Sequence, residues 1–296
     1  MSYYAKITQK KALKRGLVMK YILFNPLSGD GESESGAISY SKRIEGDYKI
    51  INITELGSYA DFVSAISEDD EVYLFGGDGT INKFANGLEG AELKTPVYYY
   101  PSGTGNDFAT DVDRHAAAEP FRINEYLTGL PTVTVKDKSY KFINGVGYGI
   151  DGYCCEVGDK MKEEGKKPNY TSIAIKGLLF SFKPRRATVT VDGVTTVFEK
   201  VWIAPTMFGR RYGGGMIPTP EQKRGGDKLS LMVFHGSSKL KTLMIFPSIF
   251  KGEHVKEKKF VTVIEGKDIT VRFDSPSPLQ IDGETILNVT SYSAKI

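Results

Sequence analysis

Short apolar runs alternate with segments of helical spacing through the first part of the chain. The apolar runs have the length and composition of buried strands and lie at residues 21–24, 48–53, 71–75 and 96–100. Helices are predicted between and after them at residues 36–44, 60–67 and 80–88. This alternation, which continues to about residue 130, predicts an α/β domain with a doubly wound sheet.

The pattern changes near residues 129–132. Beyond this point short β-branched segments alternate with period two, at residues 132–135, 140–144, 187–192, 197–204, 228–234, 260–265, 268–273 and 286–292. Helical interruptions are predicted near residues 170–182 and 240–250. The sequence therefore predicts a basic extension at residues 1–18, an α/β domain at 19–130 and an all-β, sandwich-like C-terminal domain at 131–296.

The composition is that of an ordinary globular protein. The chain has 296 residues and a net charge of +3, which is long enough for two domains and too weakly basic to indicate a nucleic-acid partner. No apolar run approaches the roughly 18 residues of a membrane span, and no signal peptide is recognisable. The only cysteines are the adjacent Cys154 and Cys155, which favours a cytoplasmic protein without a disulfide framework.

A glycine-rich turn follows the strand at residues 71–75. Gly76, Gly77 and Gly79 surround Asp78, so a ligand can approach the backbone closely and successive N–H groups can point to one side. Thr80 can cap the helix that follows, whose positive end then faces the same place. Such an arrangement predicts a phosphate-binding site. An ordinary tight turn is the alternative.

Two further loops of small residues follow predicted strands. The first contains Asn25, Pro26, Ser28 and Gly29, and the second contains Gly103, Thr104 and Asn106. In an open α/β sheet the carboxyl ends of the strands meet at one edge, where ligands bind. We therefore expect the three loops to form one site.

These motifs resemble those of the diacylglycerol, sphingosine and ceramide lipid kinases. NAD kinases, and more distantly phosphofructokinases, share a loop similar to residues 76–80. Two further motifs, residues 103–108 and Asp282-Gly283-Glu284, follow in the same order as in the lipid kinases. The resemblance covers nearly the whole chain from about residue 19. It implies a bacterial-type lipid kinase that uses ATP and Mg²⁺. The implied nucleotide-binding residues are Asn25, Pro26, Ser28, Gly29, Thr54, Gly76, Gly77, Asp78, Gly79, Thr80, Asn82, Gly103, Thr104 and Asn106.

The resemblance also implies catalytic roles for Asp282, Glu284 and Asp78. Asp282 would accept the proton of the lipid hydroxyl from a cleft between the domains, Glu284 would lie near the nucleotide or metal, and Asp78 would contact Mg²⁺. Asp-Gly between two strands is also a common hairpin turn, which is the structural alternative.

Three positions depart from the expected patterns. Asp227 is a candidate metal ligand, but the order here is Gly-Asp where the family has Asp-Gly. Lys83 stands where many of these kinases have glutamate. Residues 147–152 match G-x-G-x-x-G formally, but the β-rich sequence that follows disfavours a dinucleotide site.

Apolar and aromatic side chains stand among lysines and arginines at residues 176–186. They indicate either a helix with one face in the core or a patch that rests on anionic lipid. With the resemblance, they favour a peripheral enzyme of phospholipid metabolism that meets its lipid substrate at the inner membrane surface.

The oligomeric state stays open, with a homodimer among the allowed forms. Two alternative functions remain. One is NAD kinase activity, and the other is the binding of a nucleotide or a lipid without catalysis.

Overall fold

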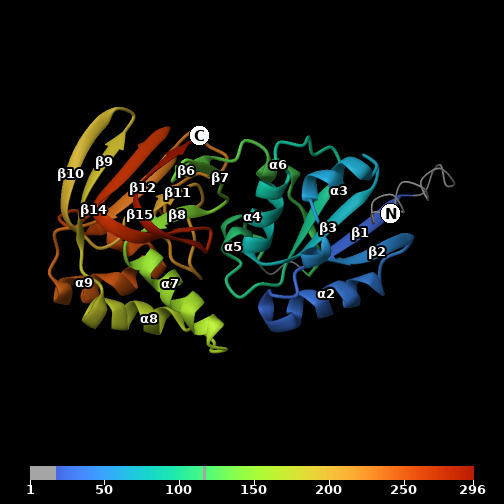
Figure 1. The fold of residues 1–296 in the computed structure, drawn as a ribbon, viewed down its shortest axis with the longest axis horizontal. Coiled ribbons are helices and arrows are strands. Elements are labelled where there is room, and N and C mark those ends of the chain that lie inside the picture. The colour runs from blue at the N-terminus through green and yellow to red at the C-terminus, as the bar shows by residue number, and fades with distance from the viewer. Residues whose placement is uncertain (1–17, 116–117) are drawn as a thin grey trace. The chain divides into compact units, whose positions relative to one another are not determined.

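The structure is a computed structural model that describes residues 18–115 and 118–296 (Figure 1). The predicted basic extension lies outside these residues, apart from Val18. The chain divides into two compact units between Thr128 and Gly129. Among the described residues, no helix combines the length and the apolar character needed to cross a membrane.

The first unit contains a five-stranded sheet in the order β2-β1-β3-β4-β5. Strands β1 to β4 are parallel, and β5 is antiparallel to β4. The strands are β1 (Met19–Phe24), β2 (Asp47–Asn52), β3 (Glu71–Gly76), β4 (Val97–Pro101) and β5 (Phe121–Arg122). Apolar side chains on both faces of β1 and β3 explain why these strands are the buried centre of the sheet.

Helices cover both faces of this sheet, as the doubly wound prediction requires (Figure 1). On one face Ile22 and Phe75 pack with Tyr40 of α2, while on the other Tyr21 contacts Phe62 of α3 edge to face. The helices are α2 (Glu32–Ser41), α3 (Tyr59–Ala65), α4 (Asp78–Gly87), α5 (Asp107–Asp111) and α6 (Asn124–Leu127). The α/β prediction for this part of the chain is confirmed.

The second unit is built on a ten-stranded antiparallel sheet. Its main path is β13-β12-β11-β8-β14-β15-β6-β7, and β9 joins β14 to β10. The strands are β6 (Thr132–Val135), β7 (Lys138–Lys141), β8 (Gly145–Tyr148), β9 (Arg185–Val191), β10 (Val194–Val201), β11 (Thr206–Met207), β12 (Leu229–Phe234), β13 (Val261–Gly266), β14 (Asp268–Ile281) and β15 (Glu284–Lys295).

Strand β14 organises this second unit. Its first half pairs with β9 and its last three residues pair with β8, with register irregularities between Arg272 and Leu279. Both halves of the strand contribute to one apolar core, in which Phe273 stacks on Tyr148 at 3.8 Å between ring centroids. The predicted β-rich C-terminal domain is confirmed.

Helices of the second unit pack around a separate apolar cluster. They are α7 (Ile150–Glu163), α8 (Tyr170–Lys176) with a π-helical turn (Gly177–Ser181), and α9 (Lys239–Ile245) with 3₁₀ turns (Phe246–Lys251 and Glu253–Lys256). The sequence patterns did not predict α7, because Gly152 and Gly158 lower its helix propensity. These glycines permit close packing, since a Cβ on Gly152 would lie 2.1 Å from the carbonyl oxygen of Pro278, and one on Gly158 would lie 2.7 Å from the Tyr170 ring.

Candidate functional site

Three glycine-containing loops meet at the carboxyl edge of the first unit's sheet. A Cβ on Gly103 would lie 2.4 Å from the Cα of Gly77, so the backbones of these two loops touch. A Cβ on Gly29 would lie 1.9 Å from the carbonyl oxygen of Ser102. The glycines at these positions therefore permit the close approach of the loops after β1, β3 and β4, which the sequence patterns predict.

Asn25 ties the loop after β1 to α4. Its Nδ2 donates to Thr80 Oγ1 at 3.0 Å, its Oδ1 accepts the N–H of Leu27 at 3.1 Å, and its own N–H donates to the carbonyl of Phe75. Thr80 is buried in the first turn of α4, and Gly77 occupies the N-cap position. The prediction that Thr80 caps this helix is wrong, because the helix begins two residues earlier and the hydroxyl accepts from Asn25.

Asp78 connects the second loop to the third. Its two carboxylate oxygens accept the backbone N–H groups of Asp107 and Phe108, at 2.9 and 2.8 Å. These are N–H groups at the start of α5, so the carboxylate caps that helix from a different segment of the chain. Asn106 shapes the same turn, because its amide exchanges hydrogen bonds with the backbone N–H and carbonyl of Gly103.

The remaining predicted residues of this unit differ in exposure. Thr104 is exposed on the third loop. Thr54 is exposed after β2, where its N–H and hydroxyl donate to Asn52 Oδ1. Asn82 is buried in α4 and accepts from the amide of Asn86.

Two buried serines near the loops were missed. Ser33 Oγ accepts the N–H of Asn25 at 3.0 Å and donates to the carbonyl of Phe75 at 2.5 Å, so it supports the first loop. Ser102 has a buried hydroxyl without a hydrogen-bond partner among the described residues. Ser102 could have been identified from the sequence by its position between Pro101 and Gly103, inside the third loop.

In the second unit, Asp282 and Gly283 form the two-residue turn between β14 and β15. Both have positive φ, 45° and 96°, as a twisted hairpin turn requires. The Asp282 carboxylate accepts three backbone N–H groups, from Ile143 at 2.5 Å, Asn144 at 2.8 Å and Gly145 at 2.9 Å. The side chain therefore holds the turn against the loop that precedes β8. Glu284 is exposed at the start of β15.

A buried carboxyl group lies close to this turn in the hydrogen-bond network. Asp151, at the start of α7, accepts from the Tyr212 hydroxyl and from the N–H of Gly152, both at 2.9 Å. Burial raises the pKa of Asp151 to about 6, although these hydrogen bonds and one from Gln280 oppose the rise. Gln280 also accepts the N–H of Gly283 at 2.8 Å and so links the buried carboxyl to the turn. Asp151 belongs to the motif at residues 147–152, but the sequence patterns did not single it out, because Tyr212 and Gln280 are distant from it in the sequence.

Asp227 has the surroundings of a surface residue. Its carboxylate pairs with Lys267 Nζ at 2.8 Å, and its side chain is 76% exposed. In the described part of the chain no three His, Cys, Asp or Glu residues are grouped so that they could hold a metal ion. The structure thus shows Asp227 in an exposed ion pair with Lys267.

Comparisons with known proteins match both units. Residues 20–129 match the diacylglycerol kinase catalytic domain, and residues 144–293 match the YegS C-terminal NAD kinase beta sandwich-like domain. A diacylglycerol kinase of Mycobacterium tuberculosis (strain CDC 1551 / Oshkosh) is 25% identical over 248 residues, which cover 79% of each chain.

Solved structures share the fold. The crystal structure of a diacylglycerol kinase from Bacillus anthracis str. Sterne has a TM-score of 0.59 and 17% identity, and covers 95% of this chain and 94% of its own. Another crystal structure from the same organism reaches a TM-score of 0.66 at 19% identity, with coverages of 96% and 94%. The solved structures show the shared fold, and the two domain matches show that the chain belongs to the family of ATP-dependent lipid kinases that carry the diacylglycerol kinase catalytic domain.

Proposed function

We propose that this lipid kinase transfers the γ-phosphate of ATP to the hydroxyl of diacylglycerol or a related lipid alcohol at a membrane surface. The observation that carries the proposal is the backbone contact of Gly77 with Gly103. It brings two glycine loops and the N-terminal end of α4 to one edge of the sheet, where backbone N–H groups and the helix dipole favour phosphate. The curated Mycobacterium tuberculosis relative, a diacylglycerol kinase, supports the choice of acceptor.

The phosphates would lie against the three loops at the carboxyl ends of β1, β3 and β4. The residues proposed to bind the nucleotide are those that the motifs predict, with Ser102 added: Asn25, Pro26, Ser28, Gly29, Thr54, Gly76, Gly77, Asp78, Gly79, Thr80, Asn82, Ser102, Gly103, Thr104 and Asn106. Asn25, Thr80 and Asn106 position the loops through the hydrogen bonds described above.

Mg²⁺ fits this site as an ion shared with the phosphates. In nucleotide sites Mg²⁺ binds through one or two carboxylates together with phosphates and water. Asp78 is the carboxylate of the glycine loop. Both of its oxygens accept backbone N–H groups, and a carboxylate oxygen can accept more than one interaction. We therefore assign Asp78 to Mg²⁺, which would offset the charge of the triphosphate when bound.

Asp282 is the proposed group that orients the acceptor hydroxyl and receives its proton, with Glu284 nearby. Three backbone N–H groups fix the Asp282 carboxylate, so its position is set before the substrate arrives. Phosphoryl transfer proceeds through a loose transition state, in which positioning contributes more than strong basicity.

The acceptor is tested with the purified chain, ATP and Mg²⁺, with either mixed micelles of diacylglycerol or NAD. Formation of phosphatidic acid is expected. NADP formation would replace the proposal by an NAD kinase. Nucleotide binding without turnover of either acceptor would replace it by a non-catalytic binding protein.

Gly79→Ala tests the phosphate site separately. A Cβ on Gly79 would meet nothing within 4 Å among the described residues, so the fold should tolerate it, and alanine in a helix is about 0.5–1 kcal/mol more favourable than glycine. We expect ATP affinity, measured by calorimetry, to fall at least about tenfold because the new methyl group obstructs the approach of the phosphates. Gly57→Ala is the control and should bind ATP normally, because a Cβ there would also meet nothing within 4 Å in the described part of the chain. Unchanged affinity in Gly79→Ala would contradict the assigned site.

A further inference from the structure

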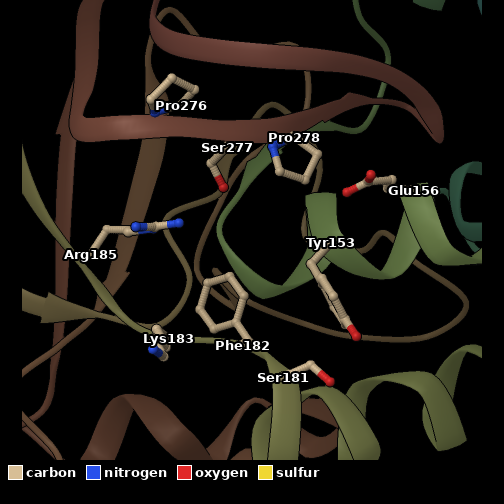
Figure 2. A pocket seen from close by; sticks show the side chains of 9 residues that line it. All are labelled: Tyr153, Glu156, Ser181, Phe182, Lys183, Arg185, Pro276, Ser277 and Pro278. Carbon is tan, nitrogen blue, oxygen red and sulfur yellow. The ribbon is translucent and has the colours of Figure 1, made fainter.

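The second unit contains a pocket of about 240 Å³ that the proposed catalytic residues do not line (Figure 2). It is formed by α7, by the segment that leads from the π-helical turn into β9, and by the irregular middle of β14. The lining residues are Tyr153, Glu156, Ser181, Phe182, Lys183, Arg185, Pro276, Ser277 and Pro278.

Arg185 gives this pocket a cationic group. Its Nε is buried and has no hydrogen-bond partner among the described residues. Figure 2 shows the guanidinium extending toward Ser277. A buried donor without a partner carries a desolvation cost, which is larger when the group is charged, so an anion at this place would remove a penalty that the protein bears without it.

The other charged groups leave the pocket cationic. Lys183 lines it together with Arg185. Glu156, on the opposite side in Figure 2, is paired with Lys160 one helical turn away at 2.7 Å. The ligand should therefore be an anion, and a planar guanidinium matches the oxygens of a phosphate or a carboxylate.

The walls of the pocket and its surroundings are apolar. Phe182, Tyr153 and the two prolines line it, and the adjacent surface exposes large apolar side chains. Phe180 is 79% exposed, Leu240 71% and Met244 68%. Lys239 of α9 donates to the carbonyl of Leu179, so the π-helical turn and α9 form one continuous surface. Exposed apolar side chains among lysines are typical of a surface that rests on anionic lipid.

We propose that this pocket binds the phosphate group of an anionic phospholipid, separately from the acceptor lipid, while Phe180, Leu240 and Met244 enter the bilayer interface. Arg185 and Lys183 would contact the phosphate oxygens, and the apolar wall would contact the glycerol backbone. The inference rests on the proposed action at a membrane surface, but it concerns binding and can be tested without turnover.

The test is sedimentation of the full chain with phosphatidylcholine vesicles that contain or lack phosphatidylglycerol. Arg185→Gln should weaken binding to the anionic vesicles at least about fivefold and leave the weak binding to pure phosphatidylcholine unchanged. Arg186→Gln is the matched control, because the neighbouring Arg186 is exposed and paired with Glu199 at 3.0 Å. It should change binding less than twofold. Equal binding by wild type and Arg185→Gln would overturn the proposal.

Two further measurements separate the alternatives. Lys183→Gln removes an exposed charge and should fold normally, so a fivefold loss with it supports the site even if Arg185→Gln is unstable. Binding of inorganic phosphate alone at 1 mM, about the scale of weak anion binding, should be undetectable, and Arg185-dependent phosphate binding without Arg185-dependent vesicle binding would indicate a free phosphate as the ligand instead of a lipid.

Kinase activity in mixed micelles of neutral detergent separates this inference from the proposed function. Arg185→Gln should retain wild-type turnover in these micelles, because no anionic lipid is present. A wild-type chain without kinase activity but with Arg185-dependent vesicle binding would refute the proposed function and support the lipid site. Loss of turnover by Arg185→Gln without loss of vesicle binding would refute the lipid site.

Discussion

Replacing Asp282 by asparagine separates its structural role from its proposed chemical role. The carboxylate accepts N–H groups from Ile143, Asn144 and Gly145. Asparagine has almost the same shape but only one oxygen, so its NH₂ group must face at least one of these donors. The substitution therefore loses one charge-assisted hydrogen bond and weakens the other two.

The expected cost follows from these three bonds. A hydrogen bond to a charged group contributes about 1.5–3 kcal/mol, so losing one bond and weakening two gives a destabilisation of about 3 kcal/mol. For a domain of this size, each kcal/mol lowers Tm by about 2–4 °C, which gives a fall of about 6–12 °C. Asp268→Asn on the same strand is the control. Asp268 makes an exposed ion pair with Lys295 at 2.8 Å, so its loss should cost less than about 1 kcal/mol.

The assay is thermal unfolding of both variants, followed by kinetics well below their transition temperatures. Folded Asp282→Asn should keep its ATP affinity and lose turnover by at least about 100-fold, which is the lower end of what a general base contributes. An unchanged Tm would refute the reasoning about the three N–H groups. Loss of ATP affinity in proportion to turnover would refute the assignment of Asp282 to the acceptor.

Two further predictions concern buried positions. Burial raises the pKa of Asp151 from 3.8 to about 6, so the folded protein binds this proton more tightly than the unfolded chain, and the stability from this group falls by roughly 3 kcal/mol as pH rises from about 4 to 6. In urea unfolding Asp151→Asn should lose this fall, and a pH dependence identical to the wild type would contradict it. Gly103→Ala would place a Cβ 2.4 Å from the Cα of Gly77 and should cost about 1–3 kcal/mol by separating the loops, with a parallel loss of ATP affinity. Gly57→Ala should change neither, and a stable Gly103→Ala with normal affinity would refute the loop contact.

Local patterns predicted those parts of the fold in which each residue's role depends on its near neighbours. Apolar runs identified β1 and β3, because strands buried on both faces are apolar throughout. The long helix α7 escaped prediction, because its glycines are unfavourable in isolation and are accommodated only by Pro278 and Tyr170 packing against them. The patterns likewise gave a helical segment up to residue 182 but not the exposure of Phe180, which depends on the elements that pack beside it.

The sequence by itself determined the two domain classes, the order of the glycine loops and the motifs of the lipid kinase family, since these depend on periodicity and on residue types at short spacing. Only the tertiary structure decided what the side chains do. Asp78 caps a helix about 30 residues away, Asp282 binds N–H groups nearly 140 residues away, and Arg185 has a buried donor that finds no partner among the described residues. The physical reason is that hydrogen bonding and burial depend on distances in space, and the folded chain brings together residues that no local pattern connects.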